Sequence, residues 1–199
     1  MPVVVLFIIF IIALVIAIPV SISLGIASVL PSIFDPSFTV GAKYLIRAMF
    51  GGLDSFPLLA VPMFVLSGII MAKGGISKKL FDVFAYFLGN FTAGMPCAVI
   101  VTCLFYGAIS GSAPATVAAV GSMTIPILTS LGYDLTFSTA LVAVAGGLGV
   151  IIPPSIPFIM CGMASGASVS DLFLAGIVPG LMIGLLLMLF AIYHCKKYG

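Results

Sequence analysis

The sequence GGLGVIIPPSIPF, from Gly146 to Phe158, lies inside a long apolar segment and places three glycines and three prolines in thirteen positions. Proline removes a backbone N–H and its ring collides with the preceding turn of a helix, while glycine weakens a helix interior. The apolar segment from Leu135 to Ala164 is therefore predicted to be a helix that is broken at Gly146 to Ser155. The rest of the sequence indicates what surrounds this break.

The composition is that of an integral membrane protein. Of the 199 residues, 63% are hydrophobic and 6% are charged, and the mean hydropathy is +1.43, whereas a soluble domain carries roughly 25% charged residues. The long apolar runs predict an all-α, multi-pass helical bundle. The net charge of +2 is too small to indicate nucleic acid as a partner.

The inventory of reactive side chains indicates neither an enzyme nor a metal centre. The single histidine, His194, lies beside the terminal lysines, and no CxxC motif is present. The cysteines fall in or beside apolar segments and are expected to pack as small side chains: Cys97, Cys103, Cys161 and Cys195. All five aspartates fall at segment ends: Asp35, Asp54, Asp82, Asp134 and Asp171. Of these, Asp134 and Asp171 are expected to be loop or cap residues. Asp171 is expected to cap a helix that begins near Leu172.

The N-terminal part of the chain permits two interpretations. Residues 3–34 would be roughly 48 Å long as one helix, against a hydrocarbon core of roughly 30 Å. They form either one tilted helix kinked at Pro19 or two short helices that turn there. Asp35 to Asp54 is predicted to be a polar loop, and Phe56 to Met71 is predicted to be the next span, with a proline-kinked entry.

The stretch that begins at Ser77 has a different periodicity. Lys78, Asp82 and Tyr86 recur at intervals of four, and large apolar residues cover the opposite side. This pattern predicts an amphipathic helix that lies in the membrane interface. The alternative is a short part of a span, close to a loop.

The apolar segment from Met95 to Leu131 is cut in its middle by SGSAPAT, residues 110–116. The flanking halves, Ala98 to Ile109 and Ala115 to Leu128, have the length expected of re-entrant segments rather than of spans. We predict a helical hairpin that turns at Gly111 to Pro114 and returns to the side from which it entered.

The charges orient this arrangement, in which Leu172 to Tyr193 is predicted to be the final crossing. A hairpin that returns to its own side places five lysines on one face of the membrane: Lys73, Lys78, Lys79, Lys196 and Lys197. Lys43 and Arg47 fall on the other face. The face with five lysines is expected to be cytoplasmic, so the hairpin is expected to enter from the cytoplasm.

The two breaks hold the candidate binding residues. Unpaired backbone groups are costly in hydrocarbon, so such breaks are tolerated only beside protein or a water-filled cavity. Hydroxyls at the first break and glycine carbonyls at the second suit a hard cation such as Na⁺, and the N–H groups of half-helix N-termini favour an anionic substrate. The candidate binding residues are Ser110, Gly111, Ser112, Ala113, Pro114, Thr116, Gly146, Gly147, Gly149, Pro153, Pro154 and Ser155, with Na⁺ expected near Ser110, Ser112, Gly147 and Gly149.

Close packing of helices is the alternative explanation for each break, because small residues four apart, such as Gly111 and Ala115, let helices approach one another. Packing alone does not require the adjacent prolines Pro153 and Pro154. Two breaks in consecutive segments therefore favour a transport site. A structural membrane subunit without a transport site and a channel stay open as other functions.

The residues described so far resemble the large membrane subunit of the tripartite ATP-independent periplasmic (TRAP) transporters, in the dicarboxylate-type branch. The resemblance covers nearly the whole chain. It is carried by five motifs in family order: FPLLAVPMFVLSGIIMAKGGISKKLFD from Phe56, GAISGSAPATVAAVGSMTIP from Gly107, LGYD from Leu131, GGLGVIIPPSIPFIMCG from Gly146 and DLFLAGIVPG from Asp171.

The resemblance implies an elevator-type secondary transporter in the bacterial inner membrane, with Na⁺ as coupling ion and no other cofactor. It implies import of organic acid anions, of the C4-dicarboxylate or sialic acid type, that arrive on a periplasmic binding protein, and a small four-helix membrane subunit as a partner. By position, the tip at residues 110–116 and the break at residues 146–155 resemble the family's first Na⁺ site. The helix at Ser77 resembles an arm that joins the scaffold to the moving transport domain.

The same resemblance implies a division of the chain. Residues 1–94 would form scaffold helices and the arm, and residues 95–199 half of a transport domain: a hairpin at 95–131, a broken helix at 135–164 and a final span at 172–195. The sequence departs from the family at Ala113, where a second serine is frequent, and at Cys161, where tyrosine often precedes glycine. The family's subunit is about twice as long and repeats this architecture inverted, so the chain resembles its N-terminal half, and transport is expected to need the C-terminal half as a partner.

Overall fold

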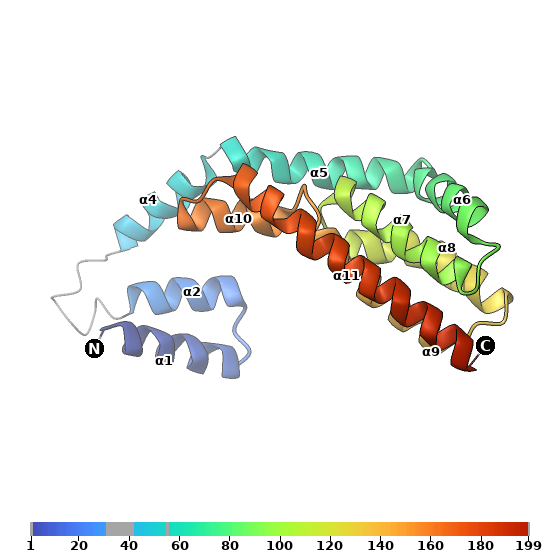
Figure 1. Ribbon diagram of the computed structural model, residues 1–199. Coiled ribbons are helices and arrows are strands. Elements are labelled where there is room, and N and C mark those ends of the chain that lie inside the picture. The colour runs from blue at the N-terminus through green and yellow to red at the C-terminus, as the bar shows by residue number, and fades with distance from the viewer. Residues whose placement is uncertain (1, 31–41, 55, 199) are drawn as a thin grey trace. The chain divides into compact units, whose positions relative to one another are not determined.

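The computed structural model describes residues 2–30, 42–54 and 56–198, and every regular element within these ranges is helical, which confirms the all-α prediction. The chain forms two compact units, residues 1–55 and 56–199 (Figure 1). In chain order the elements are α1 (Pro2–Val15), α2 (Val20–Val29), α4 (Ala42–Leu53), α5 (Phe56–Lys73), α6 (Ile76–Leu88), α7 (Gly94–Ser110), α8 (Ala113–Ser130), α9 (Leu135–Gly146), the 3₁₀-helix η1 (Gly147–Val150), α10 (Ile156–Ser165) and α11 (Val169–Tyr198).

The first unit contains two short helices where the sequence left one or two helices open. Helices α1 and α2 pack against each other and are joined by a turn that ends at Pro19. Ala17 has a φ of 63° in this turn, and the buried Ser23 hydroxyl lies 3.1 Å from the carbonyl oxygens of Ile18 and Pro19. Proline starts the second helix readily because its φ is already helical and the first turn needs no N–H. Residues 31–34 lie outside the described residues.

Helix α4 corrects the prediction of a polar loop. The loop was expected from Asp35 to Asp54, but Ala42–Leu53 is helical. The segment contains alanine, lysine, leucine, arginine and methionine, which are good helix formers, and it has no proline. Lys43 and Arg47 are both exposed and lie one helical turn apart. Lys43 and Arg47 therefore lie on one face of a helix and do not belong to a loop. The rest of the predicted loop, residues 35–41, lies outside the described residues.

Helices α5 and α6 follow the predicted pattern. Helix α5 covers the predicted span from Phe56 to Met71, continues to Lys73 and contains Pro62 in its interior. Helix α6 confirms the amphipathic helix: Phe81 is 2% exposed and Tyr86 is 80% exposed. The apolar side of α6 packs against α7. The position of α6 in a membrane interface stays a prediction.

Helix α7 lies at the centre of the second unit. It contacts α5, α6, α8, α9, η1 and α11, and Ala98, Val99, Ile100 and Cys103 on it are completely buried. A helix that is apolar on all sides is expected to be surrounded by other elements, and α7 carries no charged residue. Among the later elements, α8, α9, η1 and α11 all pack against it.

Helices α7 and α8 form the predicted hairpin, although both are longer than predicted. They have 17 and 18 residues and pack against each other. Of these two helices, α8 is long and apolar enough to cross a membrane by itself. The prediction ended the second half at Leu128, which is too early. Threonine and serine can stay in a helix when their hydroxyls bond to carbonyls of the same helix, as those of Thr129 and Ser130 do at the end of α8. Whether the hairpin is re-entrant stays a prediction.

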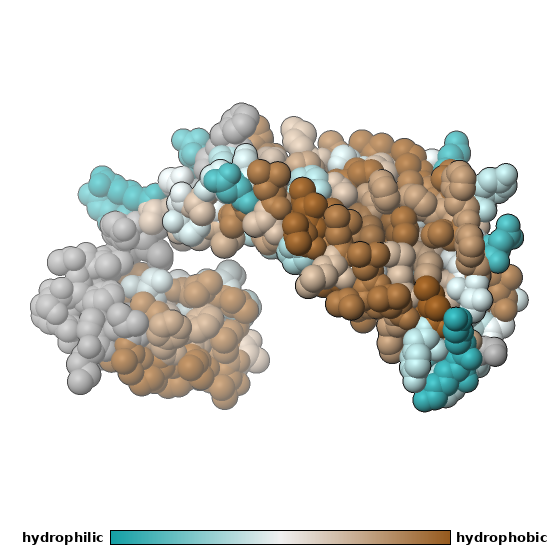
Figure 2. All heavy atoms as spheres, viewed as in Figure 1, coloured by the Kyte–Doolittle hydropathy of each residue, from teal (hydrophilic) through white to brown (hydrophobic). Residues whose placement is uncertain are grey.

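Helix α11 is the longest element, with 30 residues. It begins before the predicted Leu172 and ends beyond Tyr193, and like α8 it has the length and hydropathy of a span within the described residues. Figure 2 shows a largely apolar surface over this helix, where Leu174, Val178, Leu181 and Leu185 are exposed at helical spacing. Such a surface suits contact with lipid or with another membrane segment.

The sequence analysis divided the chain at residue 94 into scaffold helices and a moving transport domain. This division stays a prediction. The division between the compact units falls after residue 55 in the chain, whereas α6 and α7 pack against each other on the two sides of residue 94. The turn between these two helices contains Ala93, which has a φ of 60° and is buried. Within the second unit, α5 also reaches α7, α8 and α10.

Candidate functional site

The hairpin tip is a tight turn of two residues between two helix ends. Gly111 has a φ of 62° and its N–H donates to the Gly107 carbonyl at 2.8 Å, which ends α7. Ser112 is extended and immediately precedes α8, and Pro114 lies in the first turn of α8, where a missing N–H costs little. The predicted turn at Gly111 to Pro114 is confirmed, with the helix resuming one residue earlier than Pro114.

Three hydroxyl residues gather at this tip. The Ser110 and Thr116 hydroxyl oxygens lie 3.1 Å apart, and Thr116 donates to the Ser112 carbonyl at 2.8 Å. Ser110 is 1% exposed and Thr116 is 0% exposed. The Ser112 hydroxyl is half-buried and makes no hydrogen bond within the described part of the chain. The tip therefore holds two hydroxyls fixed by each other and a third that is uncommitted.

The broken helix is interrupted where the sequence predicted it. Helix α9 ends at Gly146, η1 continues to Val150, and α10 starts at Ile156. Between them, Pro153 and Pro154 supply no N–H for a helix. Ser155 is 0% exposed and immediately precedes α10: its hydroxyl donates to the Val150 carbonyl at 2.7 Å and accepts the Phe158 N–H at 3.4 Å. Ser155 therefore caps the resumed helix.

The tip and the break are in contact. The Ile156 N–H donates to the Gly111 carbonyl at 3.3 Å, and a Cβ added to Gly111 would lie 3.0 Å from the Pro154 carbonyl oxygen. A Cβ added to Gly149 would lie 2.7 Å from the Thr116 hydroxyl oxygen and 3.2 Å from the Ser112 carbonyl oxygen. The structure thus brings the two separately predicted breaks into one place.

Several predicted residues lie at the edge of this contact. Gly146 packs against Val117 of α8, deeper in the hairpin than the tip. A Cβ on Gly147 would meet nothing within 4 Å. Pro114 is exposed and Ala113 is half-buried. The binding role of each predicted residue, including that of Gly147 toward Na⁺, stays a prediction.

Some residues that shape the site were not predicted from the sequence. Gly107 of α7 is in backbone contact with Gly149. Gly68 of α5 lies behind the tip, where an added Cβ would be 3.1 Å from the Ser110 Cβ, and its carbonyl accepts the Tyr106 hydroxyl at 2.7 Å. The available signal was the spacing of Gly107 and Gly111, four residues apart on one helix face.

Helix α11 packs against the break through two of its glycines. A Cβ added to Gly176 would lie 2.5 Å from the Ile151 carbonyl oxygen, and one on Gly180 would lie 2.6 Å from Ile152. Both glycines are buried, one turn apart. The motif DLFLAGIVPG therefore owes its glycine spacing to contact between α11 and the irregular backbone.

The predicted caps have different outcomes. Asp134 precedes α9 and its carboxylate accepts the Phe137 N–H at 3.0 Å, which confirms the cap and holds the pKa of Asp134 below its ordinary value. Asp171 is not a cap, because α11 already starts at Val169. The Ser168 hydroxyl accepts the Asp171 N–H instead, at 3.4 Å. Asp171 remains favourable in the first turn of the helix, near the positive end of its dipole.

Comparisons with known proteins agree on one family. Residues 7–199 match the family model described as tripartite ATP-independent periplasmic transporter, DctM component. The isethionate TRAP transporter permease protein DctMQ of Oleidesulfovibrio alaskensis is 48% identical over 156 residues, which is 78% of this chain and 25% of the relative. The C4-dicarboxylate TRAP transporter large permease protein DctM of Vibrio cholerae is 38% identical over 195 residues, which is 97% of this chain and 42% of the relative.

A third relative is named for a different substrate. The 2,3-diketo-L-gulonate TRAP transporter large permease protein YiaN of Escherichia coli is 42% identical over 147 residues, which is 74% of this chain and 35% of the relative. The chain therefore spans between 25% and 42% of the length of these three relatives.

Proposed function

Because the chain belongs to the DctM component family of the tripartite ATP-independent periplasmic transporters, we propose that it forms one half of a Na⁺-coupled importer of organic acid anions. It acts as a multi-pass protein of the bacterial inner membrane and transports its substrate without chemical change. The remaining length of the relatives corresponds to a second half with which this chain completes the site.

The observation that carries the proposal is the meeting of four helix ends. Helix α7 ends and α8 begins at the tip, η1 ends and α10 begins at the break, and the bond from Ile156 to Gly111 joins them. Carbonyl groups at the C-terminal ends attract a cation, and N–H groups at the N-terminal ends attract an anion. Neither residues 110–116 nor residues 146–155 contain a charged side chain. The backbone and hydroxyl dipoles therefore supply the field of the site.

The oxygen atoms at the contact support Na⁺ as the coupling ion. The Ser112 hydroxyl is uncommitted, and the Ser110 and Thr116 hydroxyls face each other beside Gly149. Hydroxyl and carbonyl oxygens are ligands of hard cations. No carboxylate lies within the tip or the break to carry a proton in place of the ion. These residues, with the carbonyls of the break, would hold Na⁺.

The substrate and partners are proposed from the family. C4-dicarboxylate, isethionate and 2,3-diketo-L-gulonate, named for the relatives, are organic anions, and a substrate of the C4-dicarboxylate or sialic acid type fits the same class. A periplasmic binding protein delivers the anion, and a small four-helix membrane subunit completes the complex. Transport proceeds by an elevator movement of the hairpin, the broken helix and α11 relative to scaffold helices that include α5.

The experiment that tests this function reconstitutes the complete permease that contains this chain, with its small subunit, in liposomes. Uptake of radiolabelled succinate is measured with the binding protein outside and with an inward Na⁺ gradient, and then with K⁺ replacing Na⁺. A panel of isethionate and sialic acid is measured in parallel to identify the substrate. We expect uptake that requires both the Na⁺ gradient and the binding protein.

Two results would contradict the proposal. Anion flux that persists without the binding protein and without Na⁺ would indicate a channel. Assembly of the complex without uptake of any anion in the panel, under every gradient, would indicate a structural subunit.

A further inference from the structure

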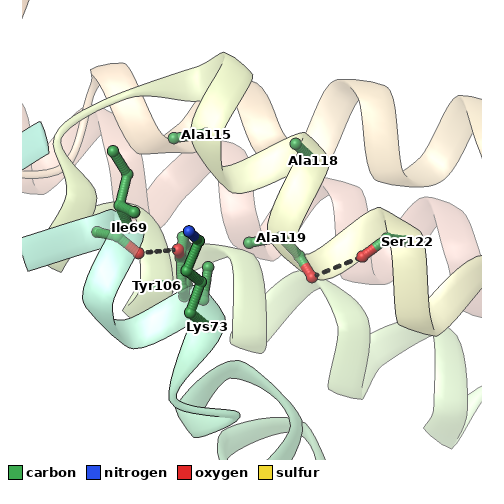
Figure 3. A pocket seen from close by; sticks show the side chains of 9 residues that line it. Ile69, Lys73, Tyr106, Ala115, Ala118, Ala119 and Ser122 are labelled. Carbon is green, nitrogen blue, oxygen red and sulfur yellow. Dashed lines mark hydrogen bonds between the residues drawn. The ribbon is translucent and has the colours of Figure 1, made fainter. Parts of the chain in front are cut away.

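A cavity of about 400 Å³ lies between α5 and α8 (Figure 3). Its walls are small: Gly68 and Ala72 from α5, and Ala115 and Ala119 from α8. Its volume is within the range of roughly 300–1,000 Å³ that is usual for sites of small ligands. The residues that line it are neutral apart from Lys73.

The polar groups of the cavity differ in what they offer. The Tyr106 hydroxyl donates its proton to the Gly68 carbonyl at 2.7 Å, so this proton is committed. Ser122 bonds weakly to the carbonyl of its own helix at Ala119, at 3.3 Å. Lys73 is exposed and makes no ion pair with any described residue. The Lys73 ammonium, which has three N–H donors and no carboxylate partner among the described residues, therefore borders a cavity whose lining is mostly apolar.

The cavity extends from the tip of the hairpin toward Lys73. Ala115 precedes Thr116 directly, and Gly68 packs behind Ser110. From Ala115 to Ser122 the cavity follows α8 for about 10 Å, or two helical turns. Figure 3 shows Lys73 and Tyr106 on one side of the cavity and Ala115, Ala118, Ala119 and Ser122 along α8. The space is long enough for a small organic acid that lies along α8 and reaches Lys73.

We propose that this cavity is an anion subsite in which the Lys73 ammonium binds an oxyanion group, a carboxylate or a sulfonate, of a small organic acid. The subsite rests on the proposed function and adds to it a charged group that the tip and the break lack. Ser122 supplies a second donor when its hydroxyl turns from Ala119 to the anion. An anionic lipid headgroup offers the same oxyanion chemistry, and the experiment distinguishes the two sources.

The test uses the complete permease purified in detergent, and succinate as the probe. Isothermal titration measures the dissociation constant for the unmodified protein and for Lys73→Met, Lys73→Arg and Lys197→Met. We expect Lys73→Met to weaken succinate binding at least tenfold, and Lys73→Arg to stay within about threefold, because a charge-assisted bond is lost only in the first. Lys197, which lies over Tyr193 and Tyr198 at the chain end, serves as the matched control and should leave binding unchanged.

A second variant tests the cavity without changing its charge. Ala118→Leu fills the space from the exposed side of α8, whereas Ala143→Leu adds the same volume to an exposed position of α9. We expect only Ala118→Leu to weaken succinate binding. Equal succinate affinity in Lys73→Met, Ala118→Leu and the unmodified protein would overturn the subsite.

The lipid arm repeats the titration in nanodiscs of phosphatidylcholine with and without phosphatidylglycerol. A Lys73-dependent affinity for phosphatidylglycerol, with succinate affinity unaffected by Lys73→Met, assigns the cavity to lipid and overturns the proposal. Failure of the transport function is separate, because it appears as absent uptake in the unmodified protein while succinate still binds through Lys73. Conversely, normal Na⁺-dependent uptake with no effect of Lys73→Met on affinity rejects only the subsite.

Discussion

Gly107 of α7 and Gly149 of η1 are in direct backbone contact: a Cβ added to Gly107 would lie 2.5 Å from the Gly149 Cα, and one added to Gly149 would lie 3.2 Å from the Gly107 Cα. Both residues are buried. The spacing between the hairpin and the broken helix is therefore set by two backbones without any side chain between them. This contact holds Gly149 beside the Thr116 hydroxyl.

Gly107→Ala should destabilise the complete permease by about 1–3 kcal/mol, the usual cost of forcing a methyl group into a filled interior. The added methyl must displace η1 from the hairpin, so the Na⁺ concentration for half-maximal uptake should also rise. The melting temperature in detergent and Na⁺-dependent uptake are measured together. Gly25→Ala is the control, since a Cβ there meets nothing within 4 Å. A Gly107→Ala protein with unchanged melting temperature would show that the contact is not tight.

Thr116→Val should raise the Na⁺ concentration for half-maximal uptake about tenfold, because it removes a hydroxyl beside Ser110 and Gly149 while keeping the shape of the side chain. Thr124→Val is the matched control. Thr124 is equally buried on the same helix, but it bonds only to the Val120 carbonyl, at 2.8 Å. Both variants should lose similar stability. If Thr124→Val changes Na⁺ dependence as much as Thr116→Val does, the hydroxyl cluster has no special role.

Ser155→Ala should lower the free energy of unfolding by about 1 kcal/mol, since it removes a helix cap and leaves the partly buried Val150 carbonyl without its donor. Denaturant or thermal unfolding in detergent provides the measurement. Ser130→Ala removes an exposed serine that bonds only to its own helix at Ile127, and it should have little effect. Equal losses in the two variants would mean that the cap at the break does not stabilise the resumed helix.

Asp134→Ala should reduce stability in a pH-dependent way. The Phe137 N–H holds the pKa of Asp134 below its ordinary value in the folded protein. Its stabilisation is therefore present above the ordinary pKa and is lost as the pH falls through the lowered one. The difference in melting temperature between the unmodified protein and Asp134→Ala should be largest near about pH 7 and should shrink toward about pH 3. Asp134→Asn, which keeps a capping oxygen but does not titrate, should remain close to the unmodified protein at about pH 7. A pH-independent difference for Asp134→Ala would contradict this account.

The boundaries of the elements were predictable where one residue type dictates the backbone. Gly111 ends α7 in a left-handed conformation, Ser155 caps α10, and Asp134 caps α9. Each of these depends on a few adjacent residues. Helix α4 and the start of α11 were missed because the same polar residues serve equally well in a loop, at a cap or on the exposed face of a helix. Local sequence does not distinguish these uses without the packing partner.

The residues behind the site were missed for a related reason. Gly68 and Tyr106 are separated by 38 positions in the chain and meet through a single hydrogen bond. Each of them alone is an ordinary residue of an apolar helix. Lys73 likewise looked like a charge at the end of a span, and only the packing of α5 beside α8 places it at a cavity.

The sequence by itself determined that this is an all-helical membrane protein whose helices are interrupted within residues 110–116 and within residues 146–155, because proline lacks a donor and glycine permits backbone that other residues avoid. It also determined the family, since five motifs retain their order. The tertiary structure decided that these two breaks meet, that α1 and α2 form a pair, and that α11 covers the second break. Such contacts join residues far apart in the chain, and they depend on which surfaces fit at close range, as Gly107 fits against Gly149.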